Sequence, residues 1–183
     1  MDALIVVDAQ NEFFAGGHRT VPNHRAAFAA IRQRVAEARD AGIPIAWIRH
    51  HNLPHEAPAF QSGSWGAQLG EGLAVDSARD ERLFDKEVYG AFSGTGLESW
   101  LRERKVTGVL LVGFYVHMCL STSAREALVR GFEVSIDPEG TGGTELHDAI
   151  LGTQSAEEVR RTALLQLTHM GVTLSQTTVG VAR

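Results

Sequence analysis

The stretch ALIVVD, from Ala3 to Asp8, is a continuous apolar run that ends at an acidic residue. Such a run is typical of a strand buried on both faces, as the strands of a parallel sheet are. The run Gly108 to Gly113 (GVLLVG) has the same character. Both stretches therefore predict central strands of a parallel sheet.

Strand and helix patterns alternate on both sides of these runs. Further strands are expected at 43–48, 83–86, 132–137 and 172–174, and helices at 22–40, 95–105, 119–130 and 157–170. Residues 50–80 hold two of the five prolines and several glycines, which predicts long loops. Strands separated by helices indicate an α/β protein, with a three-layer α-β-α Rossmann-like fold and a six-stranded, mainly parallel sheet. A chain of 183 residues predicts a single domain, 1–183.

Composition narrows the class of partner. The net charge is −5, and lysine and arginine are scattered along the chain. Nucleic acids and anionic membranes both require clustered cations, so neither is expected as a partner. The single cysteine cannot form an internal disulfide, and the apolar N-terminal run is too short for a signal peptide core or a membrane span. These features predict a cytoplasmic protein that acts on a small-molecule substrate.

Three residues whose side chains could take part in catalysis directly follow predicted strands. They are Asp8, Lys86 and Cys119, which come after the first, third and fourth strands. In open parallel sheets the ligand site lies beyond the carboxyl ends of the strands. We therefore expect the three side chains to meet at one edge of the sheet.

Cys119 opens the helix expected at 119–130. Unpaired N–H groups and the helix dipole would stabilise a thiolate there, and Lys86 would lower its pKa further while Asp8 accepts the proton. Each residue also has a structural interpretation. A lone cysteine is usually a small buried apolar residue, an acid after a strand often caps a loop, and a lysine is usually a solvated surface charge.

Three stretches resemble the isochorismatase-like cysteine hydrolases. They are IVVDAQNEFF (5–14), DKEVYGAFSGTGL (85–97) and GFYVHMCLSTSA (113–124), and GSWGA (63–67) matches a common segment of the family's long loop. The resemblance implies that Asp8, Lys86 and Cys119 form a catalytic triad. It also implies a cis peptide bond before the nucleophile, at Phe114–Tyr115, and an oxyanion hole made by the amides of Tyr115 and Cys119.

The expected reaction is cleavage of a small amide, carbamoyl or ureido C–N bond through a Cys119 thioester, with no cofactor. Phe13, Trp65, Phe92 and His117 are expected to bind the substrate, because aromatic side chains near strand ends commonly line pockets. Two alternatives stay open. One is hydrolysis of a vinyl ether of the isochorismate type, with Asp8 as general acid, and the other is a non-catalytic protein that binds a small molecule.

Histidines follow the second predicted strand. Nicotinamidases of the family hold a metal with an Asp-x-His pair at this place, whereas this chain has His50 and Asn52. We therefore expect no metal, although His50, His51 and His55 together could supply imidazole ligands. A dinucleotide cofactor is not expected, because no G-x-G-x-x-G motif follows the first strand. The family resemblance further implies a homo-oligomer, a dimer or larger, in which the loop at 52–72 reaches a neighbour.

Overall fold

The computed structural model describes residues 2–70 and 72–175. Its centre is a six-stranded sheet in which every pair of neighbouring strands is parallel, with the order β3-β2-β1-β4-β5-β8. The strands are β1 (Ala3–Val7), β2 (Ile45–His50), β3 (Glu81–Lys86), β4 (Gly108–Gly113), β5 (Glu133–Thr141) and β8 (Thr173–Leu174). The predicted six-stranded α/β fold is therefore confirmed, and the sheet is wholly rather than mainly parallel.

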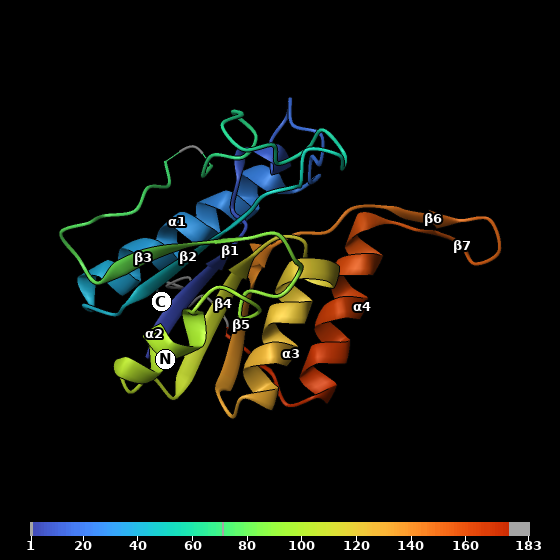
Figure 1. Ribbon diagram of the computed structural model, residues 1–183. Helices are drawn as coiled ribbons and strands as arrows, with labels where there is room; N and C mark the ends of the chain where they lie inside the picture. The colour runs from blue at the N-terminus through green and yellow to red at the C-terminus, as the bar shows by residue number, and fades with distance from the viewer. Residues whose placement is uncertain (1, 71, 176–183) are drawn as a thin grey trace, which may run out of the picture.

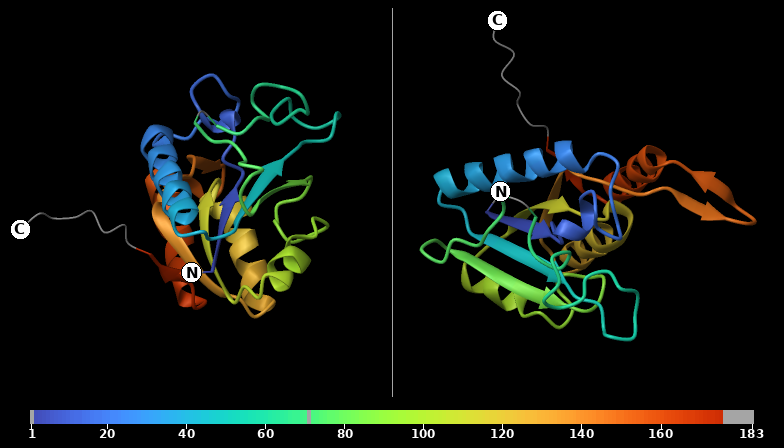
Figure 2. Two further views of the ribbon diagram at one scale, coloured as in Figure 1. Left: turned by 90° about the vertical axis from the view of Figure 1, so that its left-hand side faces the viewer. Right: turned by 90° about the horizontal axis from the view of Figure 1, so that it is seen from above.

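The sheet is covered by helices on both faces (Figures 1 and 2). Helix α1 (His24–Asp40) covers one face, where its buried residues pack with Leu4 and Val6 of β1. Helices α2 (Leu97–Glu103), α3 (Ser121–Val129) and α4 (Ala156–His169) pack on the other face with Ala3, Ile5 and Val7. Both sets of β1 side chains are buried, which explains why this strand is apolar at every position.

Several element boundaries differ from the sequence predictions. The helix expected from residue 119 begins earlier, with a π-helical turn η2 (Val116–Leu120) that leads directly into α3. The helix expected at 95–105 is shorter, because the Thr95 hydroxyl donates to the Ala91 carbonyl and Gly96 takes the capping position with a φ of 74°. Strand β5 extends four residues further than expected, to Thr141.

A hairpin that was not predicted follows β5. It consists of β6 (Leu146–Asp148) and β7 (Gly152–Gln154), which pair antiparallel outside the main sheet. Figures 1 and 2 show it projecting from the body of the molecule beyond α4. Its strands are only three residues long, too short to give a periodic signal in the sequence.

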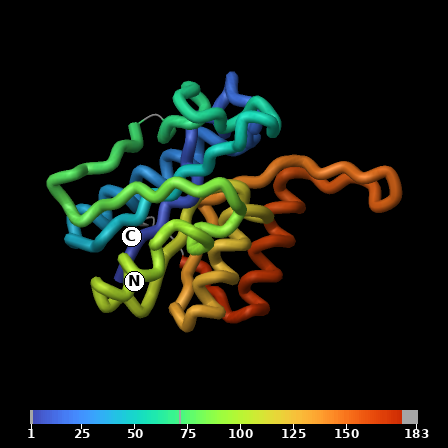
Figure 3. The backbone as a smooth tube through the Cα atoms, viewed as in Figure 1, coloured from blue at the N-terminus to red at the C-terminus, as the bar shows by residue number. Residues whose placement is uncertain are grey.

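The long loops expected between β2 and β3 are present. The backbone trace shows this segment crossing the end of the sheet beside the short 3-10 helix η1 (Asn11–Phe13) (Figure 3). Backbone hydrogen bonds join the two segments, from Asn11 to Gln68 and from Glu12 to Gly66. In the described part of the chain, no helix is long and apolar enough to cross a membrane.

Candidate active site

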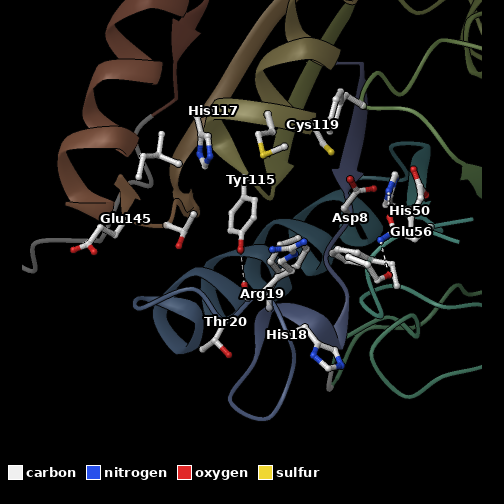
Figure 4. Close-up of a pocket in the computed structure, with 18 residues that line it drawn as sticks. Asp8, His18, Arg19, Thr20, His50, Glu56, Tyr115, His117, Cys119 and Glu145 are labelled. Atoms are coloured by element: carbon white, nitrogen blue, oxygen red, sulfur yellow. Dashed lines mark hydrogen bonds between the residues drawn. The ribbon is translucent and has the colours of Figure 1, made fainter. Parts of the chain in front are cut away.

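A pocket of about 630 Å³ lies at the carboxyl ends of the central strands. Figure 4 shows it with the side chains that line it. Asp8 and Cys119 lie in its wall, and the loops after β1 and β2 form the opposite side. This is the position at which open parallel sheets bind their ligands.

Asp8 follows β1 directly and is 1% exposed. Its φ of 50° places it in the left-handed region, which aspartate tolerates better than most residues. The Lys86 ammonium donates a hydrogen bond of 2.8 Å to Oδ2. The other oxygen, Oδ1, is buried and has no hydrogen-bond partner in the described part of the chain. One carboxylate oxygen is thus held, and the other is available for proton transfer.

Lys86 is the last residue of β3 and its side chain is fully buried. Besides Asp8, its Nζ lies 3.3 Å from Nδ1 of His50 and within hydrogen-bonding reach of the Cys119 thiol. Burial alone would lower the pKa of this ammonium. The negative charge of Asp8 and the contact with Cys119 outweigh burial, so the pKa of Lys86 is raised. The lysine therefore stays charged.

Cys119 lies within the π-helical turn η2, and both Asp8 and Lys86 interact with its thiol. Burial is the main cause that raises the pKa of Cys119 above that of an ordinary thiol, and the Asp8 carboxylate raises it further. Lys86 acts in the opposite direction but does not compensate. The sequence analysis expected the helix terminus and Lys86 to lower this pKa, whereas burial and the nearby carboxylate raise it, so the resting thiol keeps its proton.

His50 and Gln10 form a support around Lys86 that the sequence reasoning missed. The buried Gln10 amide donates to the His50 carbonyl at 2.9 Å and accepts from the His50 N–H at 2.8 Å. Since His50 Nδ1 faces the Lys86 ammonium, its Nε2 carries the proton and donates to Oδ1 of Asn52 at 2.9 Å. Burial and the nearby Lys86 lower the pKa of His50, which keeps the ring neutral.

The backbone before Cys119 has the expected form. The peptide bond Phe114–Tyr115 is cis. The amides of Val116, Met118 and Leu120 donate to backbone carbonyls, whereas the Tyr115 N–H has no backbone acceptor within the described residues. The Tyr115 amide is therefore free to donate to a substrate oxygen.

Of the four side chains expected to bind substrate, the structure places two in this pocket. Phe13 and His117 line it. Trp65 instead lines a separate surface hollow with Asn11 and is 52% exposed. Phe92 is buried in the core on the α3 face, with its ring 5.9 Å from that of Phe132. Trp65 and Phe92 thus do not reach the pocket, because their loops pack outside it.

The three histidines considered as metal ligands do not converge. His50 uses both ring nitrogens as described above, His51 contacts Oδ1 of Asp85 at 2.9 Å, and His55 is exposed. No cluster of three or more His, Cys, Asp or Glu side chains suited to a metal is found among residues 2–70 and 72–175. The donor set present here is better suited to hydrogen bonding.

Arg19 was also missed. It lies in the pocket lining on the loop after η1, beside His18 and Thr20. Nothing in its local pattern marks it, because one arginine in a polar loop is usually a solvated surface charge. Only the fold brings it opposite the strand ends.

The parallel sheet and the pocket at its carboxyl edge define an α/β protein with a pocket at the place where open parallel sheets bind ligands. Residues 2–178 match the model of the isochorismatase domain family, and the chain belongs to this family. It is 31% identical to a nicotinamidase/pyrazinamidase of Mycobacterium tuberculosis, over 91% of this chain and 98% of that protein. A ureidoacrylate amidohydrolase of Methylobacterium radiotolerans is 27% identical over 81% of this chain and 70% of that protein.

A solved structure supports the same fold. The isochorismatase of Pseudomonas putida KT2440 superposes with a TM-score of 0.87, covering 96% of this chain and 88% of that chain at 24% identity. The family is hydrolytic, and its members named above act on amides.

Proposed function

We propose that this protein hydrolyses a small amide, carbamoyl or ureido C–N bond with Cys119 as the nucleophile. The observation that carries the proposal is that Asp8, Lys86 and Cys119 meet beside one pocket, from segments that are far apart in sequence. The amide-hydrolysing relatives support the same reaction class. No cofactor is required for this chemistry.

The first half of the reaction forms a thioester. Because the thiol keeps its proton at rest, Oδ1 of Asp8 takes that proton as the sulfur attacks the carbonyl carbon. The amides of Tyr115 and Cys119 stabilise the oxyanion that results. The tetrahedral intermediate collapses, the C–N bond breaks, and Asp8 returns the proton to the leaving amine.

The second half restores the enzyme. Asp8 removes a proton from a water molecule, which attacks the thioester carbonyl, and the C–S bond breaks. The proton returns to the sulfur, and the acid product leaves. Lys86 stays charged throughout, holding Oδ2 of Asp8 in place and stabilising the sulfur while it is an anion.

The test is a screen of small amides, ureides and carbamates with the wild-type chain and with Cys119→Ala. Hydrolysis that disappears in the variant, and a substrate-derived mass trapped on Cys119 after acid quenching, would support the proposal. Full activity of Cys119→Ala would refute it. Turnover of a vinyl ether by Cys119→Ala would favour Asp8 acting as a general acid without a nucleophile.

We further propose that the chain forms a homo-oligomer. The projecting hairpin supports this, because Ile150 and Leu151 at its tip are 92% and 87% exposed. Two neighbouring aliphatic side chains on an isolated hairpin are more stable when a partner covers them. The hairpin, rather than the loop at 52–72, is therefore the segment we expect to reach a neighbour. The cytoplasmic location stays a prediction from the sequence.

A further inference from the structure

The guanidinium of Arg19 lies in the pocket without an ionic partner. Figure 4 shows it between Tyr115 and Asp8, on the side of the pocket opposite Cys119. No carboxylate forms an ion pair with it within the described parts of the chain, and no hydrogen bond from its side chain is found there. Arg19 is exposed, so its donors face the solvent that fills the pocket, and an anionic ligand that enters can take the place of that solvent.

The backbone of Arg19 is held at both of its polar groups. Its N–H donates to the Glu12 carbonyl at 3.1 Å, and its carbonyl accepts from the Tyr115 hydroxyl at 2.8 Å. The neighbouring His18 N–H donates to Oε2 of Glu12 at 2.6 Å, and Glu12 itself is buried. The loop is thus tied to a buried carboxylate and to a residue next to the nucleophile, so Arg19 starts from a fixed position in the pocket wall.

No charged side chain near the reacting atoms depends on Arg19 as its ionic partner. Asp8 is already paired with Lys86, and His50 is neutral. Glu56 and Glu145 also line the pocket, but neither lies within ion-pairing distance of the arginine. The positive charge of Arg19 is therefore available to a ligand.

A second polar group of the pocket, on the η2 side with Cys119, lacks a partner. Both ring nitrogens of His117 are buried without a hydrogen bond to any described residue. The ring stacks on Tyr115 at a centroid distance of 5.2 Å, and burial lowers the pKa of His117. A neutral imidazole offers one donor and one acceptor. Leaving both unused is costly unless a ligand or water supplies the missing bonds.

We propose that this pocket selects an anionic substrate, a small amide or ureide whose carboxylate binds the Arg19 guanidinium while its scissile carbonyl lies against Cys119. His117 would hydrogen-bond the neutral polar part of the same molecule. The reaction assigned to this substrate rests on the function proposed above. The binding preference does not, because it follows from the charge of Arg19 alone.

The test compares two alkylating reagents that differ in charge. Cys119 is alkylated with the anionic iodoacetate and with the neutral iodoacetamide, and the ratio of the two rate constants is measured by mass spectrometry. Taking this ratio cancels any change in the reactivity of the thiol itself. We expect the iodoacetate-to-iodoacetamide ratio to fall about tenfold in Arg19→Gln and to be largely kept in Arg19→Lys. Arg161→Gln, which removes an exposed arginine of α4 outside the pocket, is the matched control and should keep the wild-type ratio.

A second measurement uses ligands that resemble the expected substrate. Succinamate and its neutral analogue succinamide are compared for protection of Cys119 against iodoacetamide. Stronger protection by succinamate in the wild type, lost in Arg19→Gln, would support the proposal. Equal protection by both ligands, or a reagent ratio that does not change in Arg19→Gln, would overturn it. Neither measurement requires turnover, so a failure of the proposed reaction and a failure of the anion preference give different results.

Discussion

Nζ of Lys86 lies 3.3 Å from Nδ1 of His50, at the aligned ends of strands β3 and β2. Asp8 accepts a second bond from the same ammonium at 2.8 Å, and the Cys119 thiol also interacts with it. A buried ammonium needs such acceptors, because an unsatisfied buried donor carries a desolvation cost. The histidine therefore positions the lysine that holds the base.

This relationship predicts opposite outcomes for two similar variants. His50→Asn can place Oδ1 where Nδ1 was and keep an acceptor for Lys86, whereas His50→Gln places its polar atoms nearer the Nε2 position. We expect His50→Gln to lose about 1–3 kcal/mol in the free energy of unfolding, and most of its turnover, while His50→Asn stays close to wild type. Urea unfolding and kcat measure both effects. His51→Asn, which removes a contact with Asp85 on the surface side, is the control. Equal losses in the two His50 variants would contradict the assignment.

The Asp8–Lys86 pair should behave as one unit in stability. Lys86→Met leaves the Asp8 carboxylate buried without its cation, which costs about 3–5 kcal/mol. Asp8→Asn keeps a side chain that tolerates the left-handed backbone. The double variant should be less destabilised than the sum of the two single variants, because it leaves no unpaired charge. A double-mutant cycle measured by denaturant unfolding tests this, and strictly additive losses would contradict it.

The protonation of Cys119 should appear in its alkylation by iodoacetamide. Since burial and Asp8 raise the pKa of the thiol, the rate constant should still be rising with pH above the range in which an ordinary thiol, with a pKa of about 8.5, has levelled off. Asp8→Asn removes a negative neighbour and should shift the midpoint to lower pH. Lys86→Met removes a positive neighbour and should shift it higher. Shifts in the reverse directions would show that the two charges do not act on the sulfur as described.

Gly113 should tolerate no side chain. A Cβ at this position would lie 1.8 Å from the carbonyl oxygen of Val7, and the backbone φ is 128°. Gly113→Ala should therefore lose more than about 4 kcal/mol, in the range of severe core substitutions. Gly94→Ala is the matched control. It also has a positive φ, of 74°, but open space around it, so its loss should be about 1–2 kcal/mol. Similar losses in thermal or urea unfolding would show that strain, and not the contact with Val7, is decisive.

The proposal that the hairpin contacts a neighbouring subunit can be tested by the molar mass of the protein in solution. A homo-oligomer would have a multiple of the 19.8 kDa chain mass in light scattering after size exclusion. Replacing Ile150 and Leu151 together by serine should shift the mass toward the monomer. Val129→Ser, at a side chain that is 80% exposed on α3, should leave it unchanged. A wild-type chain that is monomeric at high concentration would contradict the proposal.

Local pattern predicted the central elements because their burial is uniform. Strands β1 and β4 are buried at every residue, and a fully buried strand appears in the sequence as a continuous apolar run. The hairpin at 146–154 escaped prediction because its residues are exposed and its strands are short. The expectation that Trp65 and Phe92 bind substrate differs from their place in the structure. The sequence near an aromatic side chain does not show in which direction its loop will pack.

By itself, the sequence determined the parallel α/β architecture and which residues follow the strand ends, because hydrophobic periodicity and chain order specify both. Only the tertiary structure decided that the Cys119 thiol keeps its proton, that His50 supports Lys86, and that Arg19 faces the pocket unpaired. Those properties depend on burial and on distances between segments remote in sequence. Desolvation and Coulomb interactions act through space, and so they are defined only once the chain has folded.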